Sequence, residues 1–148
     1  MDYILEVKNL KKSYGSLEAV KNVSFQVRRQ SLFSFLGPNG AGKSTTINII
    51  STLLSKDGGE VTLNGESGET YLRNKIGVVF QNNILDDNLT VKENLLYRGS
   101  LYINNKKGVL ERYKELRSYL QFTEFENQKF KTLSGGQKRR AEIARALF

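Results

Sequence analysis

The fold of this 148-residue chain is decided by one glycine-rich stretch, Gly37-Pro38-Asn39-Gly40-Ala41-Gly42-Lys43-Ser44. It fits the pattern of a glycine, four residues, and then glycine, lysine and serine or threonine. The glycines allow the backbone to turn tightly and to present several N–H groups to one phosphate. Lys43 adds a positive charge near the β- and γ-phosphates, and the Ser44 hydroxyl is a ligand for Mg²⁺. The stretch therefore predicts a site for the phosphates of a nucleotide.

The segments on either side of this loop predict an α/β fold. Residues 31–36 are continuously apolar, as expected of a buried strand, and 44–54 have a helical pattern, so the order is strand, loop, helix. Residues 76–80 are a second candidate for a buried strand, and 90–125 have helical character. Alternating apolar and polar residues predict short strands of an antiparallel edge sheet at 4–8, 23–27 and 60–63.

Composition narrows the chemistry that is open to the chain. With 39% hydrophobic and 26% charged residues, it has the make-up of one globular domain. It contains no cysteine and no histidine, which excludes disulfides, thiolate metal sites and a histidine base. No signal peptide or long apolar stretch is found, so a soluble intracellular chain is expected. The net charge of +8 is spread over several short clusters, which favours solvated faces but leaves a phosphate-rich or acidic partner open.

A second motif indicates which family of nucleotide-binding proteins the chain resembles. The pentapeptide Leu133-Ser134-Gly135-Gly136-Gln137, with the helical run 138–147 that follows it, closely resembles the signature motif and helix of ATP-binding cassette (ABC) ATPases. The resemblance extends to Tyr14 within 12–15, to 79–81 and to 89–95, and so covers nearly the whole chain. Read physically, Ser134 before two glycines is a helix cap that leaves backbone N–H groups exposed, either as a second anion site or as a plain capped helix.

The resemblance implies a fold and a division of the chain. It implies an α/β domain of the P-loop NTPase type, with a parallel core, an antiparallel β subdomain and a helical subdomain. The chain is then the N-terminal part of one nucleotide-binding domain. Its β subdomain and phosphate-loop core span about 1–85, its helical subdomain about 86–133, and its signature helix 134–147.

The resemblance also implies roles for individual residues, with ATP and Mg²⁺ as the cofactors. The residues expected at ATP are Tyr14, Val20, Gly37, Pro38, Asn39, Gly40, Ala41, Gly42, Lys43, Ser44, Thr45 and Thr46. Tyr14 would stack on adenine and Val20 would support its ring, the alternative being a surface tyrosine beside a turn. Gln81 would join Ser44 at the metal or orient the attacking water, unless it is a solvated glutamine at a strand end. Residues 133–137 would contact the ATP of a second nucleotide-binding domain.

The expected partners are that second domain and a membrane-spanning transporter subunit, with no nucleic acid. Residues 82–89 lie where the family meets its membrane partner, although Ile84 and Leu85 could equally pack under the helical subdomain. Residues 89–102 are most similar to cassettes of bacterial drug and polysaccharide exporters. The expected location is therefore cytoplasmic, at the inner face of the cell membrane. Two alternatives stay open: a soluble ABC protein acting on ribosomes or DNA, and a non-catalytic nucleotide-binding fragment.

Other family features are missing from the printed residues. The family carries a second apolar strand ending in an aspartate, then a catalytic glutamate, and later a histidine. The only aspartates here are Asp2, Asp57, Asp86 and Asp87, and none closes an apolar run. We therefore expect this chain alone to bind ATP weakly and not to hydrolyse it. We also expect an incomplete core sheet, with Leu32 to Leu36 left with unpaired backbone and uncovered apolar surface. Either another copy of the chain or residues beyond those printed would cover this surface.

Overall fold

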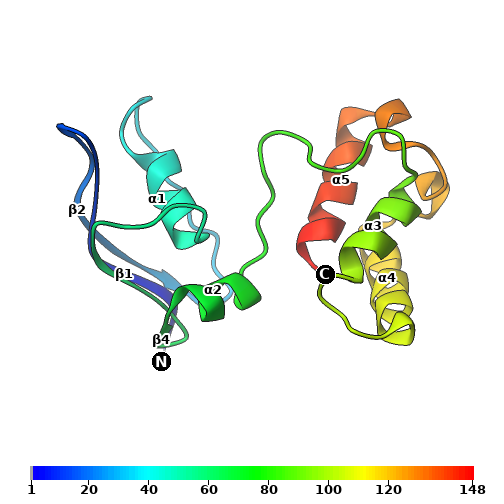
Figure 1. The fold of residues 1–148 in the computed structure, drawn as a ribbon, viewed down its shortest axis with the longest axis horizontal. Helices are drawn as coiled ribbons and strands as arrows, with labels where there is room; N and C mark the ends of the chain where they lie inside the picture. Colours follow the sequence, from blue (N-terminus) through cyan, green and yellow to red (C-terminus); the bar gives the residue numbers. More distant parts are fainter. Residues whose placement is uncertain (1) are drawn as a thin grey trace. The chain divides into compact units, whose positions relative to one another are not determined.

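The computed structural model describes residues 2–148 and divides the chain into two compact units, Met1–Ile76 and Gly77–Phe148 (Figure 1). The first unit contains the strands and two helices, whereas the second is helical. None of the helices among residues 2–148 has the length and apolar character needed to cross a membrane. The combination of strands and helices confirms the α/β class.

The first unit is built on a four-stranded antiparallel sheet in the order β2-β1-β3-β4. The strands are β1 (Tyr3–Tyr14), β2 (Leu17–Arg28), β3 (Gly58–Leu63) and β4 (Glu66–Ser67). β1 lies between β2 and β3 and pairs with both. The expected strands near 4–8, 23–27 and 60–63 are therefore confirmed, and each is part of a longer strand.

Two helices complete this unit, α1 (Lys43–Ile50) and α2 (Glu69–Lys75). Ile49 of α1 and Leu72 of α2 share one core with the sheet. The buried residues of that core are Val7, Leu10, Val20, Ile49, Val61, Leu63 and Leu72. Because Ile49 anchors α1 to this core, the start of α1 at Lys43 is held close to the end of the β1–β2 hairpin.

The two predicted buried strands, 31–36 and 76–80, are not strands in the structure. Leu32 is 98% and Leu36 is 92% exposed. A strand needs a neighbour for its backbone N–H and C=O groups, and residues 2–148 supply no parallel neighbour for either segment. The strand prediction was wrong for this reason, whereas the core sheet is incomplete among residues 2–148, as expected. The expected uncovered apolar surface is confirmed for Leu32 and Leu36, but Phe33 and Phe35 pack against Phe25 of β2.

The second unit consists of three helices that all contact one another, α3 (Val91–Gly99), α4 (Lys106–Leu120) and α5 (Gly135–Ala146). Two short 3₁₀ turns, Thr123–Phe125 and Phe130–Thr132, connect α4 to α5. Its core consists of Leu85, Val91, Leu95, Tyr113, Leu116, Phe122, Phe125, Phe130, Leu133, Ala141 and Ala144. The predicted helical character of 90–125 is thus confirmed as two helices joined by a loop.

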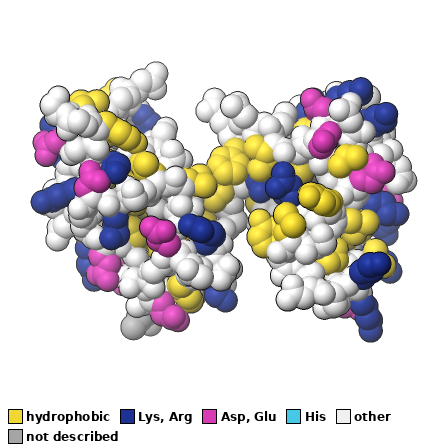
Figure 2. All heavy atoms as spheres, in the orientation of Figure 1, with side chains coloured by type: hydrophobic (Ala, Val, Ile, Leu, Met, Phe, Trp, Pro, Cys, Tyr) yellow, Lys and Arg dark blue, Asp and Glu magenta, His cyan; other side chains and the backbone are white. Residues whose placement is uncertain are grey.

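Charged side chains are mixed on the surface. On the visible face, Figure 2 shows basic side chains on both units, interspersed with acidic and apolar ones. Several basic residues are paired with nearby acids, such as Arg73 with Glu69 and Arg112 with Glu115. This distribution favours the expectation of solvated faces over one concentrated basic patch.

Candidate phosphate-binding site

The glycine-rich loop runs directly into α1, and Gly42 makes this geometry possible. Gly42 is the residue before the helix, with a φ of +77°, in the left-handed region. A Cβ added there would lie 2.3 Å from the backbone oxygen of Ala19. No side chain caps the start of α1, so the N–H groups of its first turn stay available to an anion.

Lys43 is held at this loop by the loop's own backbone. Its Nζ donates hydrogen bonds to the carbonyl oxygens of Gly37, at 2.7 Å, and Pro38, at 2.5 Å. An ammonium group has three donors, so one remains for a ligand. Among residues 2–148, no carboxylate lies within ion-pair distance of Lys43. The loop therefore presents an uncompensated positive charge.

A hollow of about 380 Å³ adjoins the loop. Its lining residues are Tyr14, Leu17, Ala19, Asn39, Gly40, Gly42, Lys43, Ser44 and Thr45. Tyr14 ends β1 and is 50% exposed, which leaves part of its ring free to stack on a planar ligand. The hollow thus joins an aromatic ring, loop glycines, a lysine and two hydroxyls.

Two predicted site residues, Val20 and Thr46, are buried and are not among the lining residues of the hollow. Val20 is 4% exposed and packs in the core, and the Cβ added at Gly42 would lie 3.4 Å from its Cγ2. Thr46 is 3% exposed and turns inward from α1. Gly37, Pro38 and Ala41 belong to the loop but are not among the lining residues either.

The structure also adds residues that the sequence reasoning missed. Leu17 and Ala19 line the hollow because Leu17 pairs with Tyr14 across the β1–β2 hairpin. The turn between these strands, with Gly15 at its bend, was the available sequence signal. Lys12 lies 5.9 Å from the centre of the Tyr14 ring. It also pairs with Asp57 at 2.7 Å, and this hydrogen bond lowers the pKa of Asp57.

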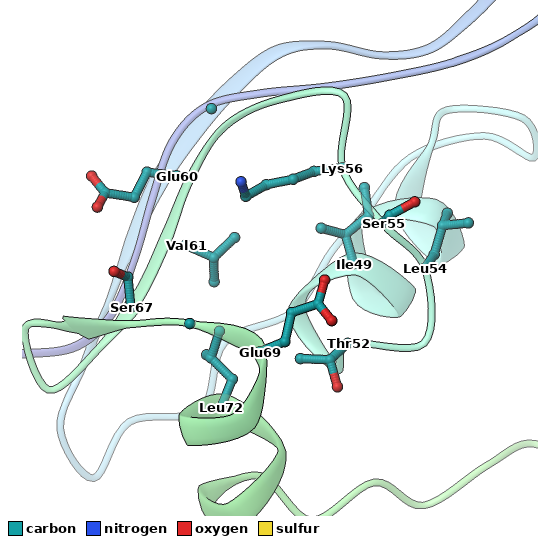
Figure 3. Close-up of a pocket in the computed structure, with 12 residues that line it drawn as sticks. Ile49, Thr52, Leu54, Ser55, Lys56, Glu60, Val61, Ser67, Glu69 and Leu72 are labelled. Atoms are coloured by element: carbon teal, nitrogen blue, oxygen red, sulfur yellow. The ribbon is translucent and has the colours of Figure 1, made fainter.

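A larger hollow, of about 520 Å³, lies elsewhere in the first unit between α1, β3 and α2 (Figure 3). Lys56 and Glu69 line it together with apolar side chains such as Val61. It shares no lining residue with the hollow at the glycine loop. Because it has neither a glycine loop nor an aromatic platform, we take the smaller hollow as the candidate site.

The signature pentapeptide lies in the second unit, at the start of α5. Ser134 caps the helix reciprocally: the Gln137 N–H donates to its Oγ at 3.4 Å, and the Ser134 N–H donates to Gln137 Oε1 at 2.9 Å. Leu133 is 6% exposed and anchors this turn in the core. Gly135 and Gly136 are exposed, with open space where a Cβ would point. Their N–H groups, which have no partner within the helix, can face an anion.

Gln81 also lies in the second unit, so the predicted residues are divided between two bodies: Tyr14 and the loop in one, Gln81 and 133–137 in the other. Gln81 is exposed, in a segment without strand structure. Of the two apolar residues that follow, one packs under the helices, as one of the alternatives expected. Leu85 is buried in the core, whereas Ile84 is 37% exposed.

The donor set around the loop suits a magnesium nucleotide and not a protein-only metal site. The residues from 2 to 148 contain no cluster of three or more acidic, histidine or cysteine side chains that could hold an ion. Ser44 lines the hollow with a neutral hydroxyl. Since Mg²⁺ is usually held by one or two protein ligands plus substrate phosphates, this donor fits an ion that arrives with the nucleotide.

Comparison with known proteins gives a consistent set of matches. Residues 20–148 match the family described as ABC transporter. The chain is 42% identical over 147 residues to the linearmycin resistance ATP-binding protein LnrL of Bacillus subtilis, covering 97% of this chain and 47% of that protein. It is 39% identical over 150 residues to the Nod factor export ATP-binding protein I of Cupriavidus pinatubonensis, covering 97% and 45%.

An import protein matches as well. The sulfate/thiosulfate import ATP-binding protein CysA of Synechococcus elongatus is 37% identical over 145 residues, covering 97% of this chain and 42% of that protein. The chain therefore spans about half the length, or less, of these relatives.

Solved structures agree with the sequence matches. The cbiO1 structure from Clostridium perfringens, part of the transporter complex cbiONQ, matches with a TM-score of 0.89 at 26% identity, covering 99% of this chain and 62% of that one. The dimeric post-hydrolysis structure of the cassette MJ0796, bound to ADP and Pi, matches with a TM-score of 0.79 at 31% identity, covering 97% and 68%.

Proposed function

Since the chain belongs to the ABC transporter family, we propose that it is part of an ATP-binding subunit that couples ATP binding and hydrolysis to export across a membrane. The observation that carries the proposal is the hollow at the glycine loop, which both Tyr14 and Lys43 line and where Lys43 pairs with no carboxylate among residues 2–148. A triphosphate and an aromatic base are the two ends of ATP. Lys43 suits the triphosphate, and the Tyr14 ring suits the base.

The residues predicted at the site have separate roles in the proposed complex with ATP and Mg²⁺. Tyr14 stacks on the adenine ring, a contact worth about 1–3 kcal/mol. The backbone N–H groups of the loop from Asn39 to Gly42 and the ammonium of Lys43 hold the phosphates. The Ser44 hydroxyl binds Mg²⁺, which neutralises phosphate charge, and Thr45 adds a hydroxyl to the phosphates. Val20 and Thr46, which are buried, act by supporting the loop.

The second unit supplies the other half of a shared site. We assign Ser134, Gly135 and Gly136 to the ATP held by a second nucleotide-binding domain, and Gln81 to the metal or the attacking water. The exposed N–H groups at the start of α5 support this assignment. The dimer named for MJ0796 supports it too. The domain limits proposed for the chain remain about 1–85, about 86–133 and 134–147.

Two other observations support export and docking on a membrane-spanning subunit at the inner face of the membrane. Two relatives are named for resistance and for export, and they are more similar to this chain than the named sulfate importer is. The exposed Ile84 beside Asp86 and Asp87 offers an apolar contact within an acidic loop. We propose this loop as the docking surface.

Residues 1–148 by themselves are proposed to bind ATP weakly and not to hydrolyse it. The lining of the hollow includes no carboxylate that could serve as a general base. In addition, the signature half of each shared site must come from a second domain, so one chain offers only half of the contacts.

Titration with a fluorescent ATP analogue tests the nucleotide site. Lys43→Ala removes a charge-assisted contact to phosphate, so affinity should fall roughly 10- to 150-fold. Lys56→Ala is the matched control, because Lys56 lines the larger hollow and not the loop, and it should bind as the unmodified chain does. Equal binding by Lys43→Ala, or a loss confined to Lys56→Ala, would refute the site.

A further inference from the structure

One acidic side chain that the proposed function leaves unused is buried in α5. Glu142 is 1% exposed. Its Oε1 accepts hydrogen bonds from the backbone N–H groups of Ile84, at 2.7 Å, and Leu85, at 3.0 Å. Its Oε2 accepts a hydrogen bond from Arg145 Nε at 3.0 Å. Burying a carboxylate costs free energy unless hydrogen bonds and an ion pair compensate for it. The contacts of Glu142 are therefore necessary for its burial.

Two arginines of the same helix hold the other end of the same loop. Arg145 donates to the carbonyl oxygen of Val78 at 2.5 Å, and its guanidinium lies 5.8 Å from the centre of the Phe80 ring. Arg139 donates to the carbonyl oxygen of Phe80 at 2.6 Å. The segment 78–85 therefore lies along α5, with its backbone groups bonded to helix side chains on both sides of Gln81.

This clamp fixes the backbone and leaves the loop's side chains free. Residues 81–84 are exposed, although the backbone on either side of them is bonded to α5. The segment belongs to no strand, so without these partners its amides and carbonyls would be satisfied only by water. Holding a loop's backbone while exposing its side chains is the arrangement expected of a loop that must present a binding group at a defined place.

We propose that Glu142, acting with Arg145, is a positioning residue that holds the Gln81 segment against α5, so that Gln81 and the Ser134 end of the helix move as one body. A carboxylate suits this position because one side chain must accept from two amides and also pair with a guanidinium. Any displacement of α5 then carries Gln81 with it. The roles of Gln81 and Ser134 rest on the proposed function, whereas the clamp itself does not.

Residue-resolved amide hydrogen exchange of the nucleotide-free chain tests the clamp. Glu142→Ala removes the acceptor, so the amides of Ile84 and Leu85 should exchange roughly 10- to 100-fold faster. The amide of Leu116, in α4, reports on global opening and should not change. Glu142→Gln keeps an acceptor oxygen but turns a donor toward Arg145, so its effect on the two loop amides should be smaller.

Glu115→Gln is the matched control. Glu115 pairs with Arg112 three residues away, as Glu142 pairs with Arg145, but its side chain is exposed and bonds to no loop amide. It should leave the amides of Ile84 and Leu85 unchanged.

Two results would overturn the proposal. One is unchanged exchange of the Ile84 and Leu85 amides in Glu142→Ala. The other is an equal increase in the exchange rate of the Leu116 amide, which would mean that Glu142 only stabilises the unit as a whole. If Glu142→Ala does not fold, Glu142→Gln decides by the same comparison. No nucleotide is present in this experiment. Failure of ATP binding would therefore not affect it, and its failure would not affect the ATP titration.

Discussion

Replacing Gly42 by alanine tests how the β1–β2 hairpin and the phosphate loop depend on each other. The new Cβ would lie 2.3 Å from the Ala19 oxygen, against an ordinary contact of at least 3.4 Å, so backbone must shift by roughly 1 Å. The φ of +77° adds about 1–2 kcal/mol for any residue with a Cβ. Overpacking adds about 1–3 kcal/mol, so Gly42→Ala should lower the free energy of unfolding by about 2–5 kcal/mol.

Gly40→Ala separates the two effects. Gly40 has a similar φ, +83°, but nothing lies within 4 Å of an added Cβ. Gly40→Ala should therefore lower the free energy of unfolding only by the cost of a positive φ, about 1–2 kcal/mol. Urea unfolding followed by circular dichroism gives both values, provided that the slopes agree.

Gly42→Ala should affect nucleotide binding as well as stability. Because Gly42 precedes the first turn of α1, the shift that its alanine variant forces should weaken binding of a fluorescent ATP analogue. A Gly42→Ala chain that is no less stable than Gly40→Ala would refute the claim that the loop is packed against Ala19.

Two further predictions concern aromatic and acidic side chains. Tyr14→Ala should weaken binding of the ATP analogue by about 1–3 kcal/mol, and Tyr119→Ala, which removes an exposed tyrosine of α4, should not; equal titration curves for both variants would contradict the stacking role. Hydrogen bonds from Tyr113 and, to a smaller extent, Arg117 lower the pKa of Glu126 from its ordinary value near 4.5. The contribution of Glu126 to stability is therefore fully present above pH 4.5 and is lost as the pH falls through the lowered pKa. Glu126→Gln should therefore flatten the acid limb of a plot of urea midpoint against pH, and an unchanged limb would count against this pairing.

The phosphate loop and the signature motif could be predicted from the sequence because each is local. Gly42, Lys43 and Ser44 are consecutive, and the turn and the helix start that they form depend on their own backbone preferences. Ser134 and Gln137 likewise cap the same turn of α5. Such patterns, in their order along the chain, were enough to indicate the family.

The segments 31–36 and 76–80 could not be assigned correctly in the same way. An apolar run predicts a strand only if a neighbouring strand accepts its hydrogen bonds, and Leu32 finds no such neighbour. The same limit applies to the hollow, where Leu17 becomes a lining residue through its pairing with Tyr14.

By itself, then, the sequence determined the identity of the phosphate loop, the capped start of α5 and the family, since these depend on residues a few positions apart. Only the tertiary structure decided that Val20 is buried and does not line the hollow, that 31–36 stays unpaired, and that Glu142 holds amides 57 and 58 positions away. The physical reason is that burial and hydrogen-bond partners are set by residues distant along the chain, and a local pattern contains no information about which of them will meet.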